Sequence, residues 1–185
     1  GSRREPVHAL REAAFSLAEG GSLAVVGESG SGKTTLARIL LGLERADAGR
    51  ITLRGAEVTR RDRSFRRTVQ PVFQNPYGSL DPMYSIHNTS AEPMRIHGVG
   101  TKSERDAKVR DLLEKVALPP EMARRFPGEL SGGQRQRVAI ARALALDPEV
   151  IVLDEAVSAL DVLVQSQILD LLAELQSELG LTYLF

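Results

Sequence analysis

The sequence contains no cysteine and no tryptophan, and only 4% of its 185 residues are aromatic. Without cysteine, disulfide frameworks, thiolate nucleophiles and zinc–thiolate sites are excluded. The shortage of aromatic side chains disfavours surfaces that stack on bases or sugars. The 24 basic residues balance the 24 acidic ones, so the basic excess usual in polyanion-binding proteins is also missing. An arginine-rich run over residues 60–67 is typical of a solvated face or loop.

Long apolar runs are absent as well. No stretch approaches the roughly 18 consecutive apolar residues of a membrane span, and residues 1–5 lack the apolar core of a signal peptide. Apolar residues nevertheless make up 42% of the chain, which excludes a disordered tail. The length fits one domain, with room for a subdomain, and is ample for a hydrophobic core.

Short apolar runs alternate with longer segments of helical periodicity. The runs typical of buried strands cover 22–26, 50–53, 69–73, 150–153 and 181–185. Apolar residues spaced three and four apart predict helices over 34–43, 103–118, 132–146 and 162–179. A strand, a glycine-rich turn and a helix follow one another in this order near the N-terminus, which predicts an α/β fold.

The regular apolar spacing is interrupted between residues 75 and 100, where prolines and glycines recur. Helical periodicity returns at Ser103, which is a fair N-cap for the next helix. We therefore expect residues 75–130 to form a largely helical insertion. Residues 1–74 and 131–185 would then make up the α/β core.

A glycine-rich loop matches the pattern G-x-x-x-x-G-K-[ST] with Gly27, Glu28, Ser29, Gly30, Ser31, Gly32, Lys33 and Thr34. Glycines let the backbone curl so that several N–H groups point at one anion. The helix that follows adds its positive end to the site. Lys33 can reach the β- and γ-phosphates, the Thr34 hydroxyl can ligate Mg²⁺, and Thr35 can bond an α-phosphate oxygen.

A glycine-rich turn with an accidental Lys-Thr pair is the alternative interpretation of this loop. The apolar strand before it and the periodic helix after it favour the phosphate site. The pattern therefore predicts that the ligand is a nucleoside triphosphate, and it leaves the task of the protein open.

A pair of carboxylates, Asp154 and Glu155, follows the apolar run 150–153. In open α/β sheets, ligands bind at the edge where strands end. Asp154 is placed there to hold Mg²⁺, directly or through water, and Glu155 can orient or deprotonate an attacking water. Taken alone, the pair could be two solvated charges that begin a turn. The phosphate loop upstream favours the metal and catalytic roles.

A serine and two glycines open the helix predicted over 132–146, within the segment LSGGQRQR at 130–137. Their backbone N–H groups can build a second anion site, although a simple helix cap is the alternative. This segment lies between the phosphate loop and the acidic strand. The order resembles the ATP-binding cassette (ABC) ATPases over nearly the whole chain. The resemblance implies a P-loop NTPase with a mainly parallel sheet flanked by helices, and a helical subdomain between the Q-loop and the signature motif.

The resemblance also assigns roles to further residues. Gln74 is similar to the Q-loop glutamine, which senses Mg²⁺ and the attacking water, and Asp161 to the D-loop aspartate. As lone residues, Gln74 would be a surface amide and Asp161 a helix N-cap. The signature segment, which contacts the ATP of a second subunit, corresponds to Ser131, Gly132, Gly133 and Gln134.

Several segments resemble one subgroup of the family, the ATPase subunits of dipeptide, oligopeptide and nickel importers. The segments that carry this resemblance are 72–82, 91–98, 154–161 and 181–185. The resemblance implies an ATPase that powers import of peptides or nickel. It leaves the cargo open, because such ATPases do not contact it.

The family continues past Phe185 with a short strand and a switch histidine that contacts the γ-phosphate. None of the three histidines, His8, His87 and His97, lies in that position, and we expect all three to be ordinary surface or loop residues. The chain is therefore expected to be a cassette that stops before the histidine. By itself it would hydrolyse ATP weakly or not at all.

Two smaller departures from the family concern single positions. Ala156 stands where most members have proline. Upstream of the phosphate loop we find no convincing adenine-stacking aromatic. Phe15 is expected to be a core residue of a strand over 13–17 instead.

The resemblance implies a head-to-tail dimer that sandwiches ATP and Mg²⁺ between two subunits. The expected partners are a second ABC ATPase, transmembrane permease subunits and, indirectly, a solute-binding protein; no nucleic acid is expected. The protein would sit peripherally on the cytoplasmic face of the inner membrane. A soluble ABC ATPase not coupled to transport, and a catalytically incompetent fragment that only binds nucleotide, remain alternatives.

Overall fold

The computed structural model describes residues 10, 12–73, 78 and 80–185 of the chain. The elements in chain order are β1 (Ser22–Leu23), α1 (Lys33–Leu40), β2 (Thr52–Leu53), β3 (Ala56–Glu57), α2 (Arg63–Thr68), β4 (Val69–Phe73), α4 (Ile86–His97), α5 (Lys102–Lys115), the 3₁₀ helices η1 (Pro120–Arg124) and η2 (Pro127–Glu129), α6 (Gly132–Leu144), β5 (Val150–Asp154), α7 (Val162–Leu179) and β6 (Thr182–Leu184). No helix among these residues is long and apolar enough to cross a membrane.

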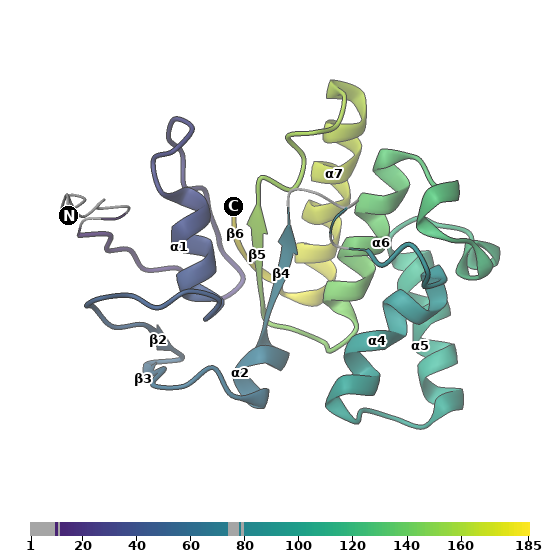
Figure 1. Cartoon of the computed structure of the whole chain (residues 1–185), viewed down its shortest axis with the longest axis horizontal. Helices are drawn as coiled ribbons and strands as arrows, with labels where there is room; N and C mark the ends of the chain where they lie inside the picture. The colour runs from purple at the N-terminus through teal and green to yellow at the C-terminus, as the bar shows by residue number, and fades with distance from the viewer. Residues whose placement is uncertain (1–9, 11, 74–77, 79) are drawn as a thin grey trace, which may run out of the picture.

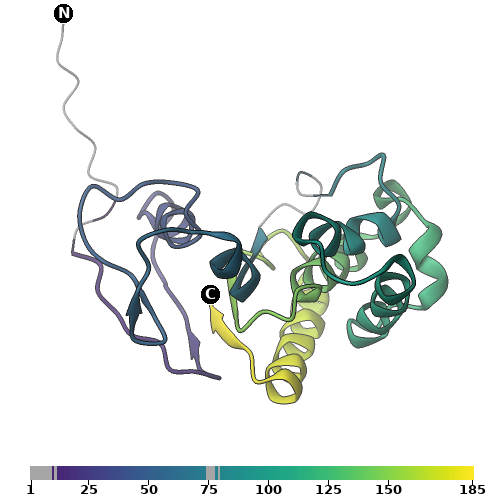
Figure 2. The same ribbon diagram turned by 90° about the horizontal axis from the view of Figure 1, so that it is seen from below.

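The main sheet has the order β1-β6-β5-β4, and all of its pairings are parallel. Helix α1 covers one face of the sheet, and α6 and α7 cover the other (Figures 1 and 2). Strand β4 runs in register with β5, from Val69 opposite Val150 to Phe73 opposite Asp154. This confirms the expected α/β class with a parallel sheet between helices.

The alternation of side chains along β5 divides the core in two. Ile151 and Leu153 belong to a large cluster with α4, α5, α6 and α7. Val152, between them, belongs to a smaller cluster with Ala37 of α1 and Phe65 of α2. Successive residues of a strand face opposite sides of a sheet, so β5 is buried on both faces and reads as a continuous apolar run.

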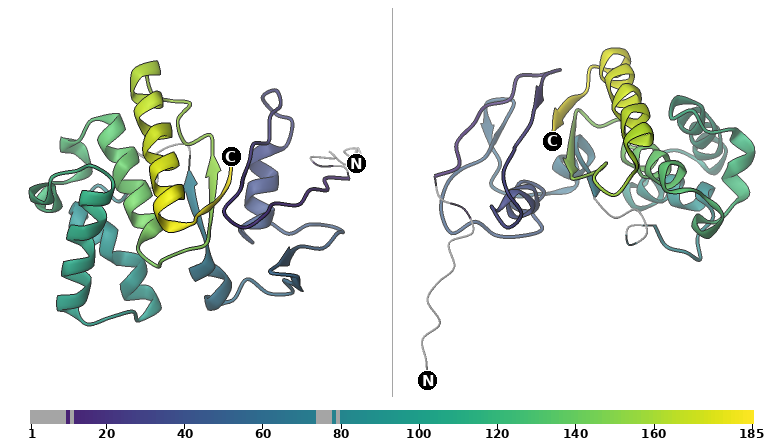
Figure 3. Two further views of the ribbon diagram at one scale, coloured as in Figure 1. Left: turned by 180° about the vertical axis from the view of Figure 1, so that it is seen from behind. Right: turned by 90° about the horizontal axis from the view of Figure 1, so that it is seen from above.

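Helices α4 and α5 and the two 3₁₀ helices gather at the side of the molecule, next to α6 (Figures 1 and 3). Helix α4 begins after Ser85, whose hydroxyl accepts a hydrogen bond from Asn88 N, and ends at Gly98 in the left-handed conformation. Helix α5 begins at Lys102, and its N-cap lies two residues before the predicted one. Its N-cap is Thr101 and not Ser103, because Thr101 and Glu104 form a reciprocal capping box.

The expected strand over 13–17 is wrong. None of these residues is in a strand, and Phe15 is 45% exposed. A strand needs a neighbour for its backbone groups, and no strand of the described part of the chain pairs with this segment. Strand β1 is likewise shorter than the expected run 22–26. It ends at Leu23, although Val25 N still donates a hydrogen bond of 2.7 Å to the carbonyl of Phe185, and Val26 is 90% exposed.

Candidate nucleotide-binding site

The predicted phosphate loop connects β1 to α1. Its geometry needs glycine at several positions. Gly30 and Gly32 have left-handed backbones, with φ of 82° and 91°. A Cβ at Gly27 would lie 2.6 Å from the Ser31 hydroxyl. The loop therefore takes a tight curl that side chains at these positions would strain or block.

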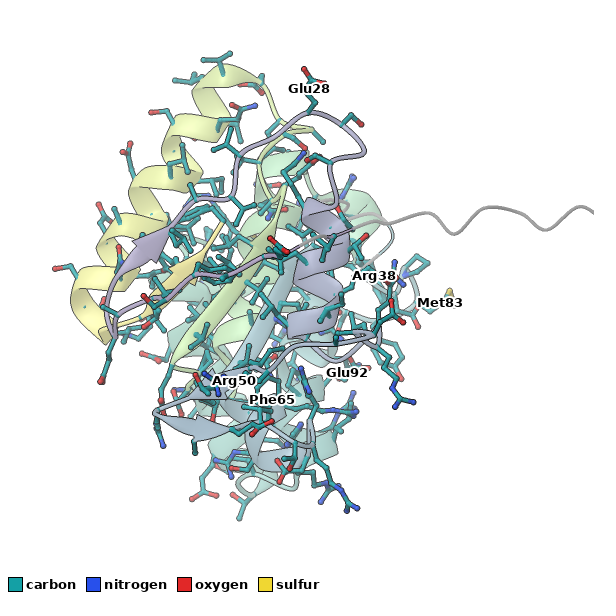
Figure 4. The ribbon with its side chains drawn as sticks, turned by 90° about the vertical axis from the view of Figure 1, so that its left-hand side faces the viewer. Glu28, Arg38, Arg50, Phe65, Met83 and Glu92 are labelled. Carbon is teal, nitrogen blue, oxygen red and sulfur yellow. The ribbon has the colours of Figure 1, made fainter. Side chains whose placement is uncertain are left out.

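Lys33 is the first residue of α1, and its side chain turns back into the curl. Its Nζ donates hydrogen bonds to the carbonyl oxygens of Gly27, at 2.7 Å, and Glu28, at 2.8 Å. Glu28 itself lies at the outer tip of the loop, pointing away from the body of the protein (Figure 4). The positive charge thus sits inside the loop, beside the N-terminus of α1, where an anion is favoured.

Thr34 joins the loop to the acidic end of β5. Its hydroxyl donates a hydrogen bond of 3.1 Å to Asp154 Oδ1. A hydroxyl and a carboxylate oxygen are the hard ligands that Mg²⁺ prefers, and Mg²⁺ usually takes only one or two protein ligands beside water and phosphate. No cluster of three or more acidic or histidine side chains that could hold a metal occurs among the described residues. Thr34 and Asp154 therefore fit Mg²⁺ as a partial ligand set that a bound nucleotide would complete.

A cavity of about 240 Å³ lies beside this contact. Lys33, Asp154, Glu155 and Ser158 are among the residues that line it, together with apolar side chains such as Leu36. The structure thus brings together the phosphate-loop lysine and both predicted carboxylates.

Glu155 has a left-handed backbone, with φ of 48°. Its carbonyl oxygen accepts hydrogen bonds of 3.0 Å from both the backbone N and the hydroxyl of Ser158. A non-glycine residue in this conformation costs on the order of 1 kcal/mol or more and persists where the surroundings enforce it, often at functional sites. Ser158 is a site residue that the sequence analysis did not single out. Its only signal was its place in the segment 154–161, three residues before Asp161.

The signature segment opens α6 as expected. The Ser131 hydroxyl accepts a hydrogen bond from Gln134 N at 3.2 Å, and the Gln134 side chain accepts one from Ser131 N at 2.9 Å. This capping box leaves other N–H groups of the first helical turn without an intrahelical partner. None of the residues 131–134 lines the cavity, and α6 lies across the sheet from α1 (Figure 1).

The two signature glycines have a packing role that the sequence did not reveal. A Cβ at Gly133 would lie 2.6 Å from Val164 Cγ1, and one at Gly132 would lie 3.3 Å from Leu160 Cδ2. The start of α6 therefore approaches the start of α7 so closely that a side chain at Gly133 does not fit. Asp161 caps α7, with Oδ1 accepting a hydrogen bond of 3.0 Å from Val164 N.

Gln74, the expected Q-loop glutamine, lies outside the described residues, as does His8. The two described histidines lie in α4, away from the residues that line the cavity. His87 contacts Asp106 of α5 at 2.9 Å, and His97 is the last residue of α4. Thr35 follows Thr34 in the first turn of α1 and is not among the lining residues.

The sequence of the chain is similar to those of known proteins. The family model described as "ABC transporter" matches residues 10–158. The chain is 49% identical to the glutathione import ATP-binding protein GsiA of Escherichia coli K12, and 50% to that of Salmonella choleraesuis, over 183 residues, or 97% of its length. It spans only 29% of the length of these relatives.

Solved structures with a similar fold belong to the same family. A dimeric post-hydrolysis structure of the ATP-binding cassette MJ0796, bound to ADP and Pi, superimposes with a TM-score of 0.84 and 31% identity, covering 100% of this chain and 82% of that one. The cbiO1 protein of Clostridium perfringens, part of a cbiONQ transporter complex, gives 0.84 and 29% identity, covering 96% of this chain and 70% of that one. The family match covers most of the chain, and the fold agrees throughout. This chain is a member of the ABC transporter family, in the part that forms the ATP-binding cassette.

Proposed function

We propose that the chain binds ATP with Mg²⁺ and takes part in its hydrolysis, as the cassette that powers an importer. The observation that carries this proposal is the contact between Thr34 and Asp154 at the cavity that Lys33 and Glu155 also line. It supports a phosphate site and a metal site that share one edge of the sheet, as phosphoryl transfer requires.

Binding would begin at the loop of residues 27–34. The Lys33 ammonium would exchange its two loop carbonyls for phosphate oxygens, and the helix N-terminus would add its dipole. Thr35 would reach the α-phosphate. Thr34 and Asp154, with Gln74, would hold Mg²⁺, whose charge neutralises the phosphates.

Glu155 would orient the attacking water and accept its proton. Its enforced backbone conformation and the Ser158 hydrogen bonds hold this residue at the end of β5. Hydrolysis would also need a second subunit. Ser131, Gly132, Gly133, Gln134 and Asp161 would contact the ATP bound by that subunit, which agrees with their absence from the lining of the chain's own cavity. The dimeric structure of the MJ0796 cassette supports the requirement for a second subunit.

The import role rests on the relatives. GsiA is named as a glutathione import protein, and glutathione is a small peptide, so a peptide-type importer is the cargo class that we propose, with dipeptides or oligopeptides favoured over nickel. Transmembrane permease subunits and, indirectly, a solute-binding protein would be the partners. The protein would then lie on the cytoplasmic face of the inner membrane, held there by the permease.

Uptake experiments in the native host test this proposal. Labelled dipeptide, glutathione and nickel are offered to cells with the intact gene and to cells whose gene carries Glu155→Gln. We expect the variant to lose dipeptide uptake and to keep nickel uptake. Unchanged uptake of all three would contradict the importer role, and loss confined to nickel would contradict the proposed peptide-type cargo.

A further inference from the structure

One short stretch of this neutral chain is strongly basic. Residues 50–67 contain seven arginines, no lysine and two acidic residues, Glu57 and Asp62. Some of these charged side chains form ion pairs or hydrogen bonds within the protein. Arg54 pairs with Glu149, and the Asp62 side chain caps α2. Arg61 is half-buried, donates to the carbonyls of Ile39 and Val58, and lies over the Phe65 ring.

The other arginines have no acidic partner among the residues that the structure describes. Arg60, Arg63, Arg66 and Arg67, which we call the α2 arginine patch, form no ion pair with any residue that the structure describes, and all four are exposed. Positions 63, 66 and 67 are three and four residues apart, so they share one face of the helix. Phe65, on the opposite face, is buried and holds that side of α2 against the core.

The patch extends to the end of α4. Arg63 Nη2 donates a hydrogen bond of 3.0 Å to the carbonyl of Ile96, in the last turn of that helix. The side chain of Ile96 is 59% exposed. Burial lowers the pKa of His97, and the charges of Arg63, Arg67 and Arg66 lower it further. The result is a basic surface with an apolar neighbour.

This surface lies far from the phosphate loop. Helix α2 precedes β4, so it sits at the end of the parallel sheet opposite to the edge that carries Asp154. Figure 4 shows Glu28 at the top of the molecule and Arg50 and Phe65 in its lower half. A partner seated on the patch would leave the cavity beside Lys33 open.

We propose that the α2 arginine patch, with Ile96 beside it, is a docking surface for an acidic segment of a protein partner. Unneutralised guanidiniums that share one face repel one another, and partner carboxylates would relieve that repulsion through bidentate hydrogen bonds. Protein interfaces are enriched in arginine and depleted in lysine, which matches the composition of 50–67. The neutral charge of the whole chain disfavours a nucleic acid or a lipid surface as the occupant.

A short synthetic peptide of glutamate and leucine serves as the probe for the whole chain. We expect it to bind the wild type, to bind more weakly as salt rises, and to bind Arg66→Glu/Arg67→Glu at least about tenfold more weakly. The matched control is Arg110→Glu/Arg124→Glu, which changes net charge equally at two exposed arginines with no ion pair to a described residue. The control should bind like the wild type. NMR should place the shifted signals at α2 and His97.

Charge reversal in the last turn of α2 could unfold this short helix, so Arg66→Gln/Arg67→Gln is measured beside it and should also lose affinity. No binding to the wild type, or equal loss in the control pair, would overturn the proposal. Patch-dependent binding of phosphatidylglycerol vesicles or single-stranded DNA without binding of the peptide would overturn it in favour of those classes. ATP binding should be the same in all variants, so failure here is distinct from failure of the nucleotide site.

Discussion

The hydroxyl of Thr34 donates a hydrogen bond to Asp154, a residue 120 positions further along the chain. This contact sets the start of α1 against the end of β5. The chain's own side chains therefore hold the phosphate loop beside the acidic edge of the sheet. Preorganisation of this kind is the main protein contribution to phosphoryl transfer.

Removal of the Thr34 hydroxyl should weaken Mg²⁺-dependent nucleotide binding. We expect Thr34→Ala to lower the affinity for MgATP at least about tenfold, because the proposed metal ligand and its hydrogen bond to Asp154 are lost together. Thr34→Ser keeps the hydroxyl and should bind nearly as well as the wild type. Titration of a fluorescent ATP analogue with Mg²⁺ and with EDTA measures this, and an equal effect of Thr34→Ala in both conditions would argue against the metal role.

Glu155→Gln should separate binding from turnover. The amide keeps the size of the side chain but cannot accept a proton, so we expect hydrolysis to fall by about 10²–10⁴-fold while ATP affinity stays within about twofold. Single-turnover hydrolysis, measured in the protein assembled with its partner subunits, checks the chemical step. Normal turnover in the variant would remove Glu155 from the catalytic role.

Gly133→Ala should destabilise the fold through overpacking. The new methyl group would lie 2.6 Å from Val164 Cγ1, and such crowding costs about 1–3 kcal/mol. Urea unfolding measures this loss. Val164→Ala in the same chain should recover most of it, because it removes the methyl group that clashes. Absence of recovery in the double variant would mean that the cost comes from elsewhere, for instance from the helix start itself.

Acidification should destabilise the chain through His97. Burial, together with Arg63, Arg67 and Arg66, lowers the pKa of this histidine below its ordinary value of 6.5. The unfolded chain then binds a proton that the folded chain does not, so the free energy of unfolding falls as the pH drops below about 6.5. His97→Gln should flatten this part of the pH profile in urea titrations. A profile as steep as that of the wild type would assign the effect to other groups.

The sequence alone correctly predicted the helices and strands whose ends are set by residues next to them in the chain. Strand β4 spans Val69–Phe73 and helix α7 spans Val162–Leu179, as expected, because α7 lies between the Asp161 cap and Gly180. The predictions that were wrong concern segments whose structure depends on residues far away in the sequence. Phe15 lies in an apolar run but has no adjacent strand, so it stays exposed.

The site was predictable to a similar extent. The motif order placed Lys33 and Asp154 at one edge of the sheet, since the carboxyl ends of parallel strands share an edge. It could not predict that Gly133 packs against Val164, because these residues belong to segments whose approach only the folded chain determines. The hydrogen bonds from Ser158 to the carbonyl of Glu155 are local, but they accompany a left-handed backbone at Glu155 that no glycine in the sequence signals.

The most direct test of the central claim is ATP affinity after removal of the phosphate-loop lysine. Isothermal titration compares the wild type with Lys33→Ala and with Lys102→Ala, a control at an exposed lysine outside the cavity. The account predicts that Lys33→Ala abolishes binding or weakens it by at least about tenfold, while Lys102→Ala binds like the wild type. Unchanged ATP affinity in Lys33→Ala would contradict the assignment of the nucleotide site.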